Sequence, residues 1–128
     1  PEILVCSSFQ FPYYPNRLDN LILPNVVNTP LEAGSDGPIF RAAIENDWLP
    51  AIETHQPDII FISAGFDAHI DDPLADIRLV EEDYRWVTEF IVAMANQYAQ
   101  GRIVSTLEGG YDLDALALSA TAHIEALA

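Results

Sequence analysis

The stretch from Ile59 to Leu74 reads IIFISAGFDAHIDDPL and carries most of the information about the fold. It opens with large apolar residues, narrows to small residues ending at Gly65, and then presents one histidine and three carboxylates. A short apolar run of this kind is typical of a parallel strand that is covered on both faces. In open α/β sheets, ligands bind beyond the carboxyl ends of the strands. We therefore expect a functional site at the rim where this strand ends.

Similar apolar runs occur elsewhere in the chain. Residues 3–6 and 102–107 each end in small or polar residues, and residues 25–31 form a weaker fourth candidate. Amphipathic helical patterns alternate with these runs, over residues 36–52, 80–100 and 112–128. Strands that alternate with helices indicate an α/β protein with a parallel sheet. We predict a three-layer αβα arrangement around a mainly parallel sheet, in one domain over residues 1–128.

Capping residues and prolines give finer expectations for these elements. Asp36 is expected to cap the first helix, and Pro50 should kink or divide it. Gly101 suits the C′ position after the second helix. The stretch 11–37 reads mostly as a long loop. The apolar residues expected to face the core from the first helix are Ile39, Ala42, Ala43, Trp48 and Ile52.

The charge balance is strongly acidic, with 20 acids, 5 arginines and no lysine, for a net charge of −15. Such a surface repels nucleic acids and anionic membranes and attracts cationic partners, although it also simply favours solubility. No apolar run is long enough to cross a bilayer. The single cysteine, Cys6, excludes an intrachain disulfide and suits a reducing compartment. We therefore expect a cytoplasmic protein with no nucleic acid or membrane partner.

The histidine and carboxylates after the apolar run admit several roles. Asp67 is held by a strand end, so it suits either a metal ligand or a turn cap. Asp67, His69 and Asp71 fit an Asp-x-His-x-Asp pattern that resembles the metal motif of ureohydrolases. However, Asp72 precedes a proline, which is typical of a turn. This favours a hydrogen-bonded loop role for His69, with Asp71 and Asp72 solvated or capping.

Two other segments carry candidate chemistry. Gly109 and Gly110 form a tight turn that places the phenol of Tyr111 beside the rim. There it would donate a hydrogen bond to an oxyanion, or instead pack over the next helix. The aromatic loop, residues 9–15, would line a narrow slot for an aliphatic side chain or pack over the sheet edge. No role is assigned to His123.

Two motifs in this order resemble the C-terminal part of the histone deacetylase-like zinc hydrolases, of the acetylpolyamine and acetoin-utilisation type. The first is SAGFDAH at residues 63–69 with DPL at 72–74, and the second is LEGGY at 107–111. The resemblance implies the arginase/deacetylase α/β fold. It also implies a catalytic zinc held by an Asp-x-His pair and one further Asp, a histidine pair that activates water, and a tyrosine that polarises the acetyl carbonyl.

The resemblance carries over to individual residues. Asp67 matches the further zinc Asp, and Tyr111 matches the carbonyl-polarising tyrosine, with Gly109 and Gly110 bordering the substrate. Tyr14 matches the aromatic residue that walls the acyl-lysine tunnel. The position of His69 is not a zinc ligand in this family.

Other positions match less closely or depart from the pattern. Ser7 matches a serine near a structural monovalent-cation site. Phe9 stands where bacterial relatives often have histidine, and residues 16–19 replace a glycine-rich turn. The histidine pair and the Asp-x-His pair belong to the N-terminal half of the family's domain and have no match here.

A catalytic zinc needs three protein ligands, so this chain resembles an incomplete enzyme. We expect part of a zinc-dependent deacetylase that acts on acetyl-lysine or acetylpolyamine substrates when complete and is inactive alone. It would be an excised piece, a truncated product or one half of a split enzyme. The alternative is a non-enzymatic assembly module that self-associates or pairs with a missing N-terminal half. A ureohydrolase-like manganese enzyme ranks lower, because no second aspartate-rich motif follows.

Overall fold

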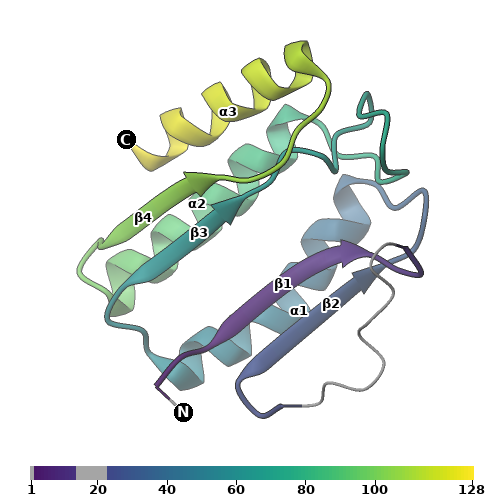
Figure 1. Cartoon of the computed structure of the whole chain (residues 1–128). Coiled ribbons are helices and arrows are strands. Elements are labelled where there is room, and N and C mark those ends of the chain that lie inside the picture. The colour runs from purple at the N-terminus through teal and green to yellow at the C-terminus, as the bar shows by residue number, and fades with distance from the viewer. Residues whose placement is uncertain (1, 14–22) are drawn as a thin grey trace.

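Two pairs of parallel strands and three helices make up the part of the chain that the structure describes (Figure 1). The computed structural model describes residues 2–13 and 23–128. In chain order the elements are β1 (Val5–Gln10), β2 (Val26–Leu31), α1 (Gly37–His55), β3 (Ile60–Ala64), α2 (Glu81–Tyr98), β4 (Ile103–Leu107) and α3 (Leu113–Leu127).

The strands run in one direction, with their carboxyl ends at the same edge (Figure 1). β1 pairs with β2 in parallel, and β3 pairs with β4 in parallel. β1 and β3 lie side by side in Figure 1 but belong to separate two-stranded sheets, so their facing edges are not hydrogen-bonded to each other. The predicted parallel α/β arrangement is confirmed.

The helices cover one side of these strands, and α1 and α2 lie behind them in Figure 1. The Thr29 hydroxyl in β2 donates to the Asp47 carboxylate of α1 at 2.9 Å and accepts from the Trp48 indole at 3.2 Å. In α3, Glu125 pairs with Arg85 of α2 at 2.7 Å. The core between sheet and helices is formed by Leu31, Phe40, Ile44, Ala64, Phe66, Ile77, Leu79 and Tyr84.

Within residues 2–13 and 23–128, no element packs on the opposite side of the strands, which we call the bare face. Ile62 packs against the core, so its neighbours in β3, Phe61 and Ser63, point to the bare face. Their partners in β4, Val104 and Thr106, lie on the same face. Phe61 is 71% exposed and Val104 is 49% exposed. The expectation that these strands are covered on both faces is therefore wrong for the described residues. The apolar pattern suits a covered strand, and the described residues form a partial αβα fold in which helices cover one side of the parallel strands.

The predicted N-cap of α1 is confirmed, but the predicted buried side of this helix is wrong in part. The Asp36 carboxylate accepts from the Ile39 N–H at 3.3 Å. Pro50 lies inside α1 and does not divide it. The prediction that Ile39 faces the core is wrong, since it is 53% exposed, and Ala42 is exposed as well. The buried residues are instead Phe40, Ile44 and Ile52, which are four and eight residues apart and so lie on one side of the helix.

Several boundaries differ from the sequence expectation. β1 begins at Val5 rather than Ile3, whereas β2 confirms the weaker strand candidate at residues 25–31, inside the stretch expected to be mostly loop. The C-cap of α2 is Ala99, so the C′ position belongs to Gln100, with φ of 53°, and not to Gly101 as predicted. Gly101 follows one residue later with φ of 73°, and its N–H donates to the Ala95 carbonyl at 2.9 Å. Among the described residues, no helix is long and apolar enough to span a membrane.

Candidate functional site

The turns that follow β3 and β4 are joined to each other at the rim. The Glu108 N–H donates to the Ala64 carbonyl at 3.0 Å, and the Phe66 N–H donates to the Gly109 carbonyl at 2.8 Å. These bonds continue the parallel ladder beyond the ends of both strands. The two motifs singled out in the sequence therefore lie next to each other in space.

Gly109 lies directly against the carboxylate of Asp67. A Cβ atom at Gly109 would be 2.9 Å from one Asp67 oxygen and 3.2 Å from the other. A side chain there would displace the carboxylate, so the missing Cβ is what permits the close approach. The structure thus brings together two residues, Asp67 and Gly109, that the sequence nominated separately.

Gly110 makes the sharp turn that leads to Tyr111. Its φ of 137° favours glycine, and a Cβ would lie 2.9 Å from Leu116 Cδ1 and 3.2 Å from Phe66 Cβ. The following residue, Tyr111, is 56% exposed. Most of this phenol therefore does not pack over α3, which favours the rim position over the packing alternative.

His69 is buried and has structural hydrogen bonds. Its Nδ1 accepts from the Asp71 N–H at 3.1 Å, so the proton of the neutral ring is on Nε2, which donates to the Glu81 carboxylate at 3.2 Å. The pKa of Glu81 is lowered, first by a hydrogen bond from its own backbone N–H and further by His69. His69 therefore connects its loop to the start of α2. The prediction of a hydrogen-bonded loop residue is confirmed.

Asp72 has a second role that the sequence did not reveal. Its Oδ1 accepts from the Leu74 N–H at 2.8 Å, as expected for a turn, whereas Asp71 is exposed. Its Oδ2 accepts from the Tyr111 N–H at 3.0 Å, across 39 residues of sequence. The Asp-Pro dipeptide signalled the turn, but no local pattern signals the contact with Tyr111.

Residues 66–79, which we call the Asp67 loop, also contact the aromatic loop after β1. The Asp76 N–H donates to the Gln10 side-chain carbonyl at 2.8 Å. The Tyr13 hydroxyl donates to the Leu74 carbonyl. Gln10 and Tyr13 thus link the aromatic loop to the segment that carries Asp67.

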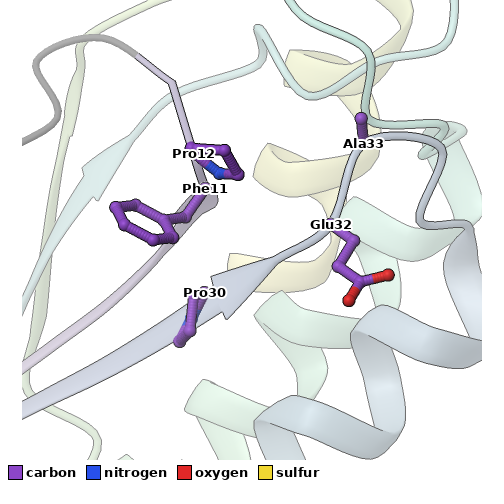
Figure 2. Close-up of a pocket in the computed structure, with 5 residues that line it drawn as sticks. All are labelled: Phe11, Pro12, Pro30, Glu32 and Ala33. Carbon is purple, nitrogen blue, oxygen red and sulfur yellow. The ribbon is translucent and has the colours of Figure 1, made fainter.

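An open pocket of about 450 Å³ lies beside the ends of β1 and β2 (Figure 2). Its lining within the described part of the chain is Phe11, Pro12, Pro30, Glu32 and Ala33. The aromatic loop contributes the Phe11 ring and Pro12, but the pocket is open and also lined by Glu32, so the narrow slot for an aliphatic side chain stays a prediction. Tyr14, the predicted tunnel wall, and residues 16–19 lie outside the described residues.

Ser7 lies apart from the rim, in the middle of β1. It is half-buried, and it lies opposite Asn28 on the bare face, since the alternate residue Ser8 pairs with Thr29 on the helix side. Nothing in its surroundings tests a monovalent-cation site, so that role stays a prediction.

Tyr84 is a neighbour of Asp67 that the sequence reading missed. It is 6% exposed, and its ring lies 5.1 Å from that of Phe66. Burial, and next the charge of Asp67, raise the pKa of this phenol well above its ordinary value. Its hydroxyl has no hydrogen-bond partner among the described residues. Tyr84 therefore remains a neutral phenol close to the carboxylate.

The described residues do not form a complete zinc site. They contain no group of three histidine, cysteine, aspartate or glutamate side chains placed to hold a metal ion. A catalytic zinc needs three protein ligands, and Asp67 supplies one carboxylate. The donor set of this part of the chain therefore does not fit zinc by itself.

Comparison with known proteins places these features in a family. The family model described as histone deacetylase domain matches residues 1–127. The chain is 38% identical to an uncharacterized protein of Synechocystis sp., over 99% of this chain and 41% of that protein. It is 39% identical to type-2 histone deacetylase 2 of Dictyostelium discoideum, over 80% of this chain and 6% of that protein.

A solved structure agrees with this result. The crystal structure of the HDA15 HD domain superposes with a TM-score of 0.83 at 30% identity, covering 97% of this chain and 37% of that one. The chain therefore spans less than half the length of each of these relatives.

Proposed function

The chain belongs to the histone deacetylase family, and from this we propose that it forms the part of a deacetylase-like amide hydrolase that carries Asp67 and Tyr111. The observation that supports this best is the joining of the two motif turns, where Gly109 contacts the Asp67 carboxylate. When complete, the enzyme would act on acetyl-lysine or acetylpolyamine substrates.

Each rim residue has a proposed task. Tyr111 donates a hydrogen bond from its phenolic hydroxyl to the carbonyl oxygen of the acetyl group, where negative charge develops. Its exposure leaves the hydroxyl accessible to a substrate. Asp67 is one ligand of a zinc ion in the complete enzyme, and Gly109 and Gly110 border the substrate. Tyr14 as a tunnel wall and Ser7 beside a monovalent cation are further parts of this proposal.

We propose that the chain is inactive alone, because the described residues offer one zinc ligand of the three required. The test is to purify the chain, measure its zinc content after desalting, and assay it with an acetyl-lysine peptide. We expect no retained zinc and no turnover that a chelator abolishes. Robust chelator-sensitive turnover by the isolated chain would contradict this part of the proposal.

The positive claim is tested by grafting. The matching segment of the HDA15 HD domain is replaced by this chain, and turnover of an acetyl-lysine peptide is compared with that of the parent domain. Tyr111→Phe should lower kcat by about 100-fold to 1,000-fold, as for loss of an oxyanion donor. Tyr98→Phe makes the same chemical change on α2 and should leave kcat within about twofold. Equal activity of the two variants would exclude the role of Tyr111.

The acidic charge supports a cationic substrate. The net charge of −15 attracts a lysine-containing peptide or a polyamine at low ionic strength. In the grafted domain, KM for an acetylpolyamine should rise with salt, while KM for a neutral acetyl-amide should not. Equal salt dependence for both would remove the argument for a cationic substrate.

The bare face supports a partner, which we propose is the remainder of a deacetylase domain. The chain matches 41% of the Synechocystis protein and 37% of the HDA15 HD domain, so a larger part of each relative lies outside the match. Phe61 and Val104 are exposed, and the facing edges of β1 and β3 are not paired with each other. Exposed apolar surface and open strand edges favour association. We place this assembly in the cytoplasm, where a single free thiol is expected.

A non-enzymatic assembly module remains the second candidate, because the same bare face suits a second copy of this chain. Sedimentation velocity separates the two. A monodisperse monomer that binds the N-terminal part of a deacetylase domain supports the first, and a concentration-dependent dimer supports the second.

A further inference from the structure

The buried carboxylate of Asp72 joins the two turns of the rim. Asp72 is 6% exposed, and a buried carboxylate requires hydrogen-bonding partners. Its two oxygens have separate donors: Oδ1 takes the Leu74 N–H at 2.8 Å, and Oδ2 takes the Tyr111 N–H at 3.0 Å. The first bond shapes the Asp67 loop locally. The second connects that loop to the turn after β4.

The connection falls at a point where Tyr111 has few other restraints. In the described part of the chain, the bond to Asp72 is the hydrogen bond that the Tyr111 N–H makes. Its side chain is 56% exposed, so packing does not fix the phenol. The preceding Gly110 and the following Asp112, which caps α3, hold the chain on either side but give the Tyr111 N–H no acceptor. The direction of the phenol therefore depends on the backbone position that Asp72 holds.

We infer that Asp72 is a positioning residue, which fixes Tyr111 relative to Asp67 through the Tyr111 backbone. One rigid segment then carries both Asp67 and the acceptor that orients Tyr111, so the two groups keep a constant separation. This deepens the proposed function and rests on it only for the consequence in catalysis. The placement of Tyr111 is a structural claim with its own test.

Asp72→Asn is the informative change. Asparagine keeps one acceptor oxygen, which can serve either the Leu74 N–H or the Tyr111 N–H, so one of these two amides meets its NH₂ group, donor against donor. Asp71→Asn is the matched control, because it removes the same charge from the adjacent exposed position. Asp72→Ser is a second test variant, because serine retains a turn acceptor near Leu74 but is too short to reach Tyr111.

The first readout is amide hydrogen exchange of the ¹⁵N-labelled chain. The Tyr111 amide should be protected in the unmodified chain, although its side chain is exposed. In Asp72→Asn or Asp72→Ser its exchange should accelerate about tenfold or more, since hydrogen bonds to charged groups are strong. In Asp71→Asn, the exchange rate of the Tyr111 amide should stay within about threefold of that in the unmodified chain. The exchange rate of the Ile44 amide should stay within the same range in every variant.

Three results would overturn the inference. One is a Tyr111 amide that exchanges at the unprotected rate in the unmodified chain, which needs no variant at all. Another is a folded Asp72→Ser chain in which Tyr111 keeps its protection, or an Asp72→Asn chain in which both Tyr111 and Leu74 keep theirs. The third is equal acceleration of Tyr111 and Ile44, which would show general destabilisation instead of local positioning.

The second readout uses the active grafted domain and separates this inference from the proposed function. Asp72→Asn should lower kcat at least tenfold with little change in KM. In a Tyr111→Phe background it should have no further effect, because the two residues act through one group. If Asp72→Asn lowers kcat in the Tyr111→Phe background as much as it does alone, the inference is overturned. If Tyr111→Phe itself has no effect, the proposed function fails, while hydrogen exchange still decides whether Asp72 positions Tyr111.

Discussion

The rim and the bare face belong to the same strands but differ in completeness. At the rim, Asp72 and Gly109 bring the loops after β3 and β4 into defined contacts, and His69 joins the loop after β3 to the start of α2. On the bare face, Phe61 and Val104 are exposed to solvent. The comparison teaches that the positions of Asp67 and Tyr111 are set within this chain, whereas the covering of the sheet is not. An incomplete domain can thus contain an ordered part of a site.

The largest expected effect contrasts a covered side chain with a bare one. Ile44→Ala should lower the free energy of unfolding by about 2 to 5 kcal/mol, because Ile44 is 0% exposed and its loss leaves a cavity. Phe61→Ala should change it by less than about 0.5 kcal/mol, because Phe61 is 71% exposed. Urea denaturation of the monomer measures both. Similar costs would show that the bare face is covered in solution.

The turn after β4 can be destabilised by a substitution at Gly110. Gly110→Ala should cost about 2 to 4 kcal/mol of unfolding free energy, because it combines an unfavourable φ with a contact to Leu116. Gly34→Ala is the control, since φ there is 85° but no atom lies within 4 Å of the added Cβ. It should cost about 1 to 2 kcal/mol, from backbone strain alone. Equal values in urea denaturation would remove the packing argument at the rim.

Some of these features could be predicted from the sequence, and others could not. The apolar runs and the cap at Asp36 act through neighbours in sequence, so the strands, helices and α/β class followed from pattern. The bond from Asp72 to Tyr111 spans 39 residues and depends on how two turns meet, which no local pattern encodes. An exposed apolar surface was expected of a partial sheet, but which face stays bare could not be predicted, because an apolar strand reads alike whether its cover lies within the chain or outside it.

Cysteine labelling compares the two sides of the sheet. Cys6 lies opposite Val27, on the side that faces α1, and burial raises the pKa of its thiol from 9.0 to about 11. This lowers the thiolate fraction about a hundredfold. A Ser63→Cys thiol on the bare face, in a Cys6→Ser background, should therefore react with a disulfide reagent about a hundredfold faster. Comparable rates would mean that Cys6 is not covered as the structure shows.

The smallest expected effect concerns the joint of α2, α3 and β4. The Thr88 hydroxyl donates to the Tyr84 carbonyl at 2.7 Å, so it accepts from His123 Nδ1 at 2.7 Å, and His123 Nε2 accepts from the Ser105 hydroxyl at 2.8 Å. Burial lowers the pKa of His123 below its ordinary value of 6.5. No role could be assigned to this histidine from sequence, because its partners come from two other elements.

The sign of the pH effect follows from that shift. As pH falls below 6.5, the unfolded chain takes up a proton at His123 before the folded chain does, so stability falls. The slope from this one group stays below about 1.4 kcal/mol per pH unit. Stability curves at pH 5.5 to 7, measured by urea denaturation, should be flatter for His123→Gln by that contribution. Identical slopes would show that His123 titrates alike in both states.

The central claim is that this chain holds an ordered but incomplete part of a deacetylase site, and fragment complementation tests it most directly. The isolated chain is mixed with the N-terminal part of the HDA15 HD domain that lies outside the match, and chelator-sensitive turnover of an acetyl-lysine peptide is measured with sedimentation velocity. The account predicts a one-to-one complex, with turnover that neither part shows alone and that Asp67→Ala abolishes. Turnover by the chain alone, or a stable complex whose turnover is indifferent to Asp67→Ala, would contradict it.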